Sequence, residues 1–149
     1  MTNHLLITLA SSKEDLASCL AIRWTVFVEG QNVPEDREID GLDVSSQHYL
    51  LSLDNTAVGT ARVRYIDEKV KIERVSILPH YQGKGLGKKL VQFIIDDVRN
   101  NEATKKVILS SQTSAIPFYE SLGFRICSDE YMDANISHKD MQIMLTAKS

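Results

Sequence analysis

One stretch of the chain, residues 74–91, most constrains what this sequence can fold into. Apolar residues before Pro79 indicate a buried strand, and Leu86, Leu90 and Val91 follow at helical spacing. Between them lies the glycine-rich turn Gln82-Gly83-Lys84-Gly85-Leu86-Gly87. A turn of this kind at the start of a helix directs backbone N–H groups into one small space at the positive end of the helix dipole. The stretch therefore predicts a strand, a tight turn and a helix that together bind a phosphate or pyrophosphate.

The rest of the chain predicts one mixed α+β (α/β) domain built around a single sheet. Ser12, with Asp15 three positions later, predicts the capped start of a helix over residues 13–28. Close spacing and polar turns such as Asp54-Asn55 predict an antiparallel meander. The expected strands are 5–9, 47–53, 56–66, 69–78, 106–110, 124–127 and 141–145, and the other expected helices are 86–98 and 114–122 with a possible helical turn within 29–44.

Composition narrows the function classes. The chain of 149 residues fits one domain, residues 1–149, and its net charge of −3 and pI of about 5.8 argue against a nucleic-acid partner. Cys19 and Cys127 are far apart, which favours a reduced, cytoplasmic protein. The apolar run Leu5–Leu9 is too short to cross a membrane, and the four histidines show no metal-ligand spacing. We therefore expect no metal, no membrane and no nucleic acid.

The glycine turn is open to several readings. A Walker A loop is disfavoured because Gly87-Lys88-Lys89 lacks the hydroxyl residue that binds magnesium. A dinucleotide site would open the first βαβ unit, whereas this turn follows a meander. A coenzyme A pyrophosphate site needs neither magnesium nor a ribose-binding acid. A tight turn without a ligand is the remaining alternative, and three glycines in five residues, flanked by Lys84, Lys88 and Lys89, argue against it.

Two motifs in order point to a family. Gln82 to Gly87 matches the Gln/Arg-x-x-Gly-x-Gly/Ala signature of the GNAT superfamily of N-acetyltransferases. The later Ala115-Ile116-Pro117-Phe118-Tyr119-Glu120-Ser121-Leu122-Gly123-Phe124 resembles its second hallmark, Ala-x-x-Phe-Tyr-Glu-x-x-Gly-Phe. The segments 23–34 (Arg-x-x-Val-Phe-Val-Glu-x-Gln-x-Val-Pro) and 136–141 (Ile-x-His-x-x-Met) resemble the ElaA/YjcF branch. The resemblance extends over the whole chain.

The resemblance implies a GNAT fold, with a mostly antiparallel sheet of about seven strands flanked by about four helices. It implies acetyl-CoA as co-substrate and a sheet that opens beside the central strand, where backbone groups near Val75 and Ile77 would bind the pantetheine arm like an added strand. The position of Ser76 favours a packed strand residue over a ligand contact. The residues expected to contact the donor are Val75, Ser76, Ile77, Gln82, Gly83, Lys84, Gly85, Leu86, Gly87, Lys88, Gln112 and Phe118.

Tyr119 is the principal catalytic candidate. Its phenol could return a proton to the coenzyme A thiolate, although like Phe118 it could also only pack in the core. For a general base there are two candidates. Glu73 would need a pKa raised by burial, or would instead form an ion pair with Arg62 or Arg64. His138 titrates near neutral pH but could be structural, and deprotonation through water would need neither.

The acidic segment 29–43 carries six acids against Arg37 alone. By family analogy it would face the acceptor entrance and attract a cationic amine; the alternative is a solvated loop. Arg23 and Trp24 could line the same pocket. The predicted function is acetyl transfer to a primary amine of a small molecule or peptide by direct attack, in a possible homodimer. A non-catalytic acyl-CoA-binding or sensing domain is the alternative, and a nucleotide-binding module a third.

Overall fold

The structure, a computed structural model, describes residues 4–145 and contains one sheet of eight strands. The strand order is β1-β2-β3-β4-β5-β8-β6, with β7 paired to β8. Only β4 and β5 run parallel, so the sheet is mostly antiparallel as expected. The strands are β1 (Leu5–Leu9), β2 (Gln47–Leu53), β3 (Thr56–Ile66), β4 (Lys69–Ile77), β5 (Lys106–Gln112), β6 (Arg125–Ile126), β7 (Tyr131–Asp133) and β8 (Ile136–Met144).

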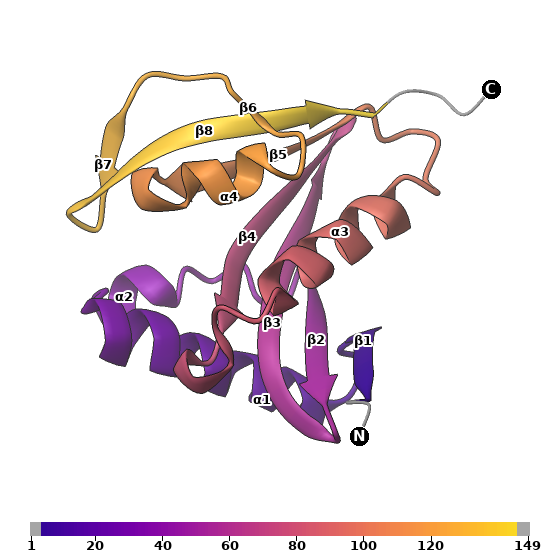
Figure 1. The fold of residues 1–149 in the computed structure, drawn as a ribbon, viewed down its shortest axis with the longest axis vertical. Coiled ribbons are helices and arrows are strands. Elements are labelled where there is room, and N and C mark those ends of the chain that lie inside the picture. The colour runs from indigo at the N-terminus through magenta and orange to yellow at the C-terminus, as the bar shows by residue number, and fades with distance from the viewer. Residues whose placement is uncertain (1–3, 146–149) are drawn as a thin grey trace.

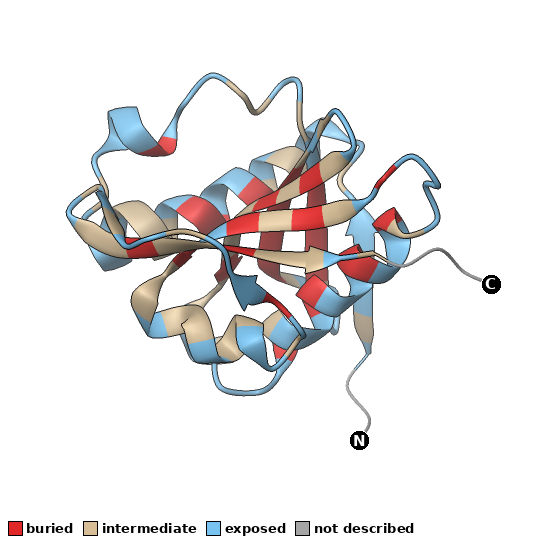
Figure 2. Ribbon diagram, turned by 90° about the horizontal axis from the view of Figure 1, so that it is seen from above, coloured by how far each residue is buried: buried red, intermediate tan, exposed pale blue. Residues whose placement is uncertain are grey.

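Four α-helices flank the sheet: α1 (Lys13–Arg23), α2 (Glu35–Glu38), α3 (Leu86–Val98) and α4 (Ile116–Glu120). Strand alternation separates two packing faces, because neighbouring residues such as Leu50 and Leu51 point to opposite sides of β2. Leu51 belongs to the main core with the inner face of α3, whereas Leu50 packs with Cys19 and Ile22 of α1. Figure 2 shows buried positions gathered on the central strands and on the sheet-facing sides of helices.

The first helix begins where the sequence predicts and changes form near its end. Ser12 Oγ accepts a hydrogen bond from the Asp15 N–H at 3.0 Å, which confirms the predicted cap. After Arg23 the chain continues as a π-helix over Trp24–Glu29. π-Helical turns are rare and often mark functional sites, and this one adjoins the cavity described below.

The strands that follow confirm the meander, with one addition. Asp54, Asn55 and Asp67 have positive φ and close the two tight turns between β2, β3 and β4. The additional strand is β7, which forms a hairpin with β8 through the positive-φ pair Ala134 and Asn135. The short β7 has little alternation of apolar and polar residues. For this reason the sequence predicted seven strands where the structure has eight.

The sheet opens between β4 and β5. Their parallel ladder ends at the pair Ile72 and Leu109, although β4 continues to Ile77 and β5 to Gln112. At the same point β4 bulges against β3, and Arg74 adopts a φ of 54°, which is unusual for a residue other than glycine. In Figure 1, α4 and strands β7 and β8 lie in the upper part of the molecule and α1 and α2 in the lower part, with β4 between them. The expected opening beside the central strand is therefore present.

Candidate active site

A cavity of about 750 Å³ occupies the opening between β4 and β5. It runs from the glycine turn at the start of α3 to the loop around α2 and the β7–β8 turn. The end beside the glycine turn is called the donor end here, and the end between α2 and the β7–β8 turn is called the acceptor end. The volume of the cavity falls within the range typical of sites that bind small molecules.

Backbone groups form the donor end. Gly83 and Gly85 have φ values of 77° and 79°, and α3 begins directly after Gly85. In the described part of the chain, no hydrogen-bond acceptor pairs with the backbone N–H groups from Gly83 to Lys88. The side chain of Gln82 donates to the carbonyl of Ile77 at 2.9 Å and thereby ties the turn to β4. A row of free donors at a helix start is a fitting site for a pyrophosphate.

The backbone conformation of this turn favours glycine at two positions. A Cβ at Gly83 or Gly85 would meet no protein atom within 4 Å, so the protein itself leaves the space above them open. Their positive φ is what disfavours other residues. Gly87 is closer to its surroundings, since a Cβ there would lie 3.5 Å from Phe118. The turn therefore keeps its donors accessible through its backbone conformation.

The residues expected at the donor end mostly line the cavity. Lys84 is the exception: its ammonium group lies 5.6 Å from the ring centre of Tyr81, and it is not among the lining residues. Ser76 borders the cavity but is buried, and its hydroxyl donates to the carbonyl of Arg74. The expected residues that do line it are Val75, Ser76, Ile77, Gln82, Gly83, Gly85, Leu86, Gly87, Lys88, Gln112 and Phe118.

Tyr119 lies on α4 and lines the cavity. Its ring packs edge-on against Phe118 and Phe124, with ring centres 5.0 and 5.8 Å away. Burial raises the pKa of the Tyr119 phenol to about 12. The phenol is therefore protonated at neutral pH, as a proton donor must be. Its ring also packs against other aromatic rings, as the alternative of a core residue expected.

His138 reaches the cavity from β8. It is largely buried, stacks on Tyr131 with ring centres 5.9 Å apart, and places its Nδ1 2.7 Å from the carbonyl of Ile136. Because a carbonyl only accepts hydrogen bonds, Nδ1 carries the proton in that contact. In the neutral ring the other nitrogen, Nε2, is then free to accept a proton. This is the arrangement that a general base requires.

Glu73 also lines the cavity, but its environment is not that of a base with a raised pKa. Burial alone would raise the pKa of Glu73, yet the hydrogen bond from Arg64 and the charges of Arg62 and Lys71 outweigh burial and lower it. The expectation of a pKa near neutrality is therefore wrong, because the surrounding cations stabilise the carboxylate. The alternative reading is the one observed: Glu73 forms ion pairs with both Arg62 and Arg64.

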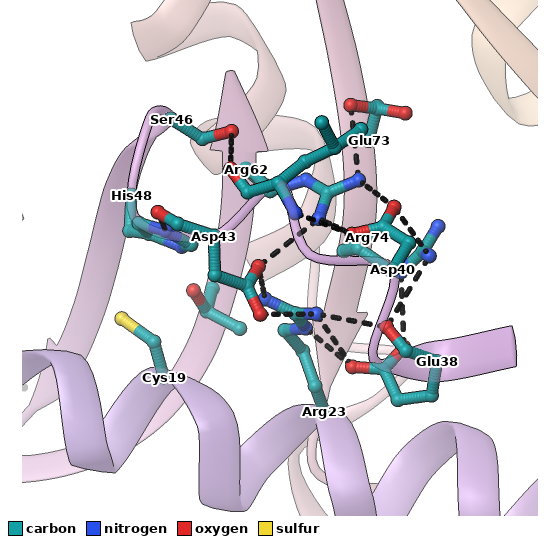
Figure 3. A network of polar contacts seen from close by, with 12 residues as sticks. Cys19, Arg23, Glu38, Asp40, Asp43, Ser46, His48, Arg62, Glu73 and Arg74 are labelled. Atoms are coloured by element: carbon teal, nitrogen blue, oxygen red, sulfur yellow. Dashed lines mark hydrogen bonds and ion pairs between the residues drawn. The ribbon is translucent and has the colours of Figure 1, made fainter. Parts of the chain in front are cut away.

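Arginines hold three acids of the acidic segment, Glu38, Asp40 and Asp43, whereas Glu29, Glu35 and Asp36 are exposed as a solvated loop would have them. Figure 3 shows Arg23 of α1 and Arg62 of β3 converging on Asp43, at 2.8 and 3.0 Å. Glu38 binds both Arg23 and Arg74, and Asp40 binds both Arg62 and Arg74. Both Arg23 and Arg62 are fully buried. These carboxylates are therefore not available to attract an amine, which corrects the expectation for Glu38, Asp40 and Asp43.

Other residues line the acceptor end in place of Arg23 and Trp24. They come from the π-helix and the segment after it: Val26, Phe27, Gln31 and Val33. Two contacts join the lower and upper walls there. Gln112 donates to Gln31 at 2.8 Å, and Arg37 pairs with Asp133 at 3.1 Å. These four residues lie in segment 23–34, which resembles the ElaA/YjcF branch. The spacing of residues in that segment does not distinguish those that line the cavity from those that pack in the core.

The described residues, 4–145, also bear on metal and membrane binding. No cluster of histidine, cysteine or acidic residues there has the arrangement of a metal site. None of the helices in that range combines the length and apolar character that a membrane span would need.

Comparisons with known proteins agree with the fold. The sequence model described as "Acetyltransferase (GNAT) domain" matches residues 23–145. The chain is 34% identical to the Bacillus subtilis protein "Uncharacterized N-acetyltransferase YjcF", over 89% of this chain and 95% of that protein. It is 30% identical to Escherichia coli "Protein ElaA", over 87% and 88% of the two chains.

Solved structures show the same fold. The crystal structure of Escherichia coli ElaA superposes with a TM-score of 0.82 and 28% identity, covering 95% of this chain and 99% of that chain. An N-acetylglutamate synthase from Neisseria gonorrhoeae, solved with coenzyme A and N-acetyl-glutamate, superposes with a TM-score of 0.72 and 20% identity, over 97% of this chain and 36% of that one. The expected resemblance is confirmed: this chain belongs to the GNAT family of acetyltransferases and is built as an acyltransferase.

Proposed function

We propose that this protein transfers the acetyl group of acetyl-CoA to a primary amine by direct attack. One observation carries the proposal: a single cavity joins the free N–H groups of the glycine turn to the side chains of Tyr119 and His138. A donor with a pyrophosphate at one end and a reactive group at the other would extend along such a cavity. Family membership supports acyl transfer in general, and the amine acceptor is the part that we add.

The residues present fit coenzyme A. The N–H groups from Gly83 to Lys88 would hold its pyrophosphate, and the backbone of β4 beyond Ile72, which has no strand partner on the β5 side, would pair with the pantetheine arm. When bound, acetyl-CoA supplies the acetyl thioester. We assign the cavity wall near Val75 to the reacting end, where the β4 bulge turns the backbone towards the opening.

Each catalytic role follows from a protonation state. His138 Nε2 would take a proton from the ammonium group of the acceptor, directly or through water, because Nδ1 is already held by the carbonyl of Ile136, and the neutral amine would then attack the thioester carbonyl. A backbone N–H of the bulged part of β4 would stabilise the oxygen that gains charge as the new C–N bond forms. As the C–S bond breaks, Tyr119 Oη would give its proton to the leaving sulfur, and the second proton lost by the acceptor nitrogen would restore the phenol through water. Glu73 has no proton-transfer role in this scheme, since its carboxylate is held by arginines.

Replacing Tyr119 by phenylalanine tests the proposal, because the ring and its packing are kept and only the proton is lost. We expect the rate of thiol release from acetyl-CoA with an amine panel to fall by about 100-fold or more. Coenzyme A affinity, measured by calorimetry, should stay within about twofold. Tyr65→Phe, at an exposed tyrosine of β3, is the matched control.

Three outcomes would contradict the proposal. An unchanged rate in Tyr119→Phe would remove the acid role. Tight coenzyme A binding with no thiol release from any amine would favour the non-catalytic acyl-CoA-binding alternative. Thermal protection by ATP or NAD but not by coenzyme A would instead indicate a nucleotide-binding module.

A further inference from the structure

The ion-pair network beside the acceptor end has one positive charge in excess. It links five cations (Arg23, Arg62, Arg64, Lys71 and Arg74) to four carboxylates (Glu38, Asp40, Asp43 and Glu73). Outside the network, the rim residues Arg37 and Asp133 pair with each other and add no net charge. Buried charges are stable only when they are paired, so the position of the excess charge within the network matters.

The excess lies at the Glu73 end of the network, where Glu73 and Lys71 line the cavity. Arg23, Arg62 and Arg74 each contact at least two carboxylates. Arg64 and Lys71, by contrast, share Glu73 as their only carboxylate within the network, and Glu73 also pairs with Arg62. The Lys71 ammonium is the more weakly held of the two, at 3.7 Å from Glu73 Oε2. Lys71 is therefore the cation with the most remaining capacity to bind an anion.

The strand register adds a second reason. Arg64 of β3 and Lys71 of β4 lie directly opposite each other in the antiparallel ladder. Like charges in opposite positions repel each other, and a further carboxylate near them would relieve the repulsion. Lys71 lines the cavity and keeps about a quarter of its side chain exposed, at 27%. An anion that enters the acceptor end can therefore reach it.

We propose that Lys71 is the acceptor-binding residue for a carboxylate, and that the acceptor is an amine that carries this carboxylate several bonds away from the reacting nitrogen. The separation follows from the strand: Lys71 lies four residues before Val75, which corresponds to roughly 13 Å along β4. The acceptor class is therefore that of ω-amino acids and of amino acids with an amine at the end of the side chain. This inference rests on the proposed acetyl transfer and names its substrate class.

Matched acceptors test the charge requirement. ε-Aminocaproate, its amide ε-aminocaproamide and hexamethylenediamine share the amine and the chain length and differ at the far end. We expect kcat/KM to be at least about tenfold higher for the carboxylate than for the amide, with the difference mainly in KM. Lys71→Met should bring this ratio close to one, and Lys71→Glu should favour the diamine. Lys69→Met, two residues away on the same strand and not on the cavity wall, is the control and should keep the wild-type ratio.

A binding measurement separates this inference from the proposed function. Calorimetry on protein saturated with coenzyme A would compare N-acetyl-ε-aminocaproate with the corresponding amide. Tighter binding of the carboxylate that Lys71→Met abolishes supports the carboxylate site, even if no amine releases thiol and the proposed acetyl transfer fails. Equal binding and equal rates for the two compounds in the wild type, or an equal loss in Lys69→Met, would overturn the carboxylate site while acetyl transfer stands.

Discussion

The two ends of the cavity are built in opposite ways. At the donor end, consecutive residues from Gln82 to Lys88 present backbone groups, and the positive φ of Gly83 and Gly85 sets their direction. At the acceptor end, side chains from α1, α2, β3 and β4 meet through ion pairs between residues far apart in the chain. A site made of adjacent backbone can be read from a short motif. A site made of distant side chains depends on the fold being known first.

The largest effect on stability is expected from a substitution that disrupts only the acceptor end. Arg62→Met removes a fully buried cation and leaves Asp40, Asp43 and Glu73 without their shared partner. Breaking a buried ion network of this kind costs about 3–5 kcal/mol in the free energy of unfolding. Urea denaturation would measure it. Arg64→Met is the control, because Arg64 is partly exposed and has one carboxylate partner, and it should cost less than half as much.

The second largest effect is expected at low pH, which should destabilise the ion pairs at the acceptor end. The pKa of Asp40 is lowered first by its hydrogen bond from Arg62, and the pKa values of Asp43 and Glu73 are also lowered because their arginine contacts outweigh burial. Groups with a lowered folded-state pKa contribute stability above their ordinary pKa and lose it as the pH falls through the folded-state value. We expect a loss of about 2 kcal/mol beginning below about pH 4. Unfolding curves of Arg62→Met should show a weaker acid dependence than the wild type; an equal dependence would assign it to other groups.

A smaller loss of stability is expected from a substitution that affects only the donor end. Gly85→Ala places a side chain at a φ of 79°, which costs about 1–2 kcal/mol, and shifts the N–H groups that follow. Gly41 has the same φ and the same open surroundings but lies outside the cavity wall. Gly41→Ala should therefore lose similar stability in thermal unfolding. Only Gly85→Ala should also weaken coenzyme A binding by calorimetry, and equal affinities in both variants would contradict the donor site.

The smallest effect is expected where the two walls meet. The Arg37 and Asp133 side chains are each 58% exposed, and exposed pairs contribute about 0–1 kcal/mol. Arg37→Ala should therefore leave the urea midpoint nearly unchanged. A loss as large as that of Arg62→Met would mean that the rim pair belongs to the buried network.

The sequence predicted well wherever the signal was local. The Ser12 cap, the meander and the turn after Gln82 each depend on a few adjacent residues, and each is found as expected. The pairing of Arg23 and Arg62 with the acidic segment was missed, because a run of acids looks the same whether water or arginine surrounds it. Glu73 shows the limit most clearly, since its lowered pKa depends on three cations from two strands.

The opening between β4 and β5 has a consequence for how this sheet is protected. Beyond Ile72, the side of β4 that faces β5 forms a strand edge inside the molecule, in addition to the outer edges of the sheet. Open strand edges invite pairing with other chains and aggregation. Here the Gln31–Gln112 and Arg37–Asp133 contacts join the two walls, so a slender flexible molecule fits the gap more readily than a second polypeptide strand. Amide hydrogen exchange of Val75 and Ile77 should accordingly be slow only when the gap is filled.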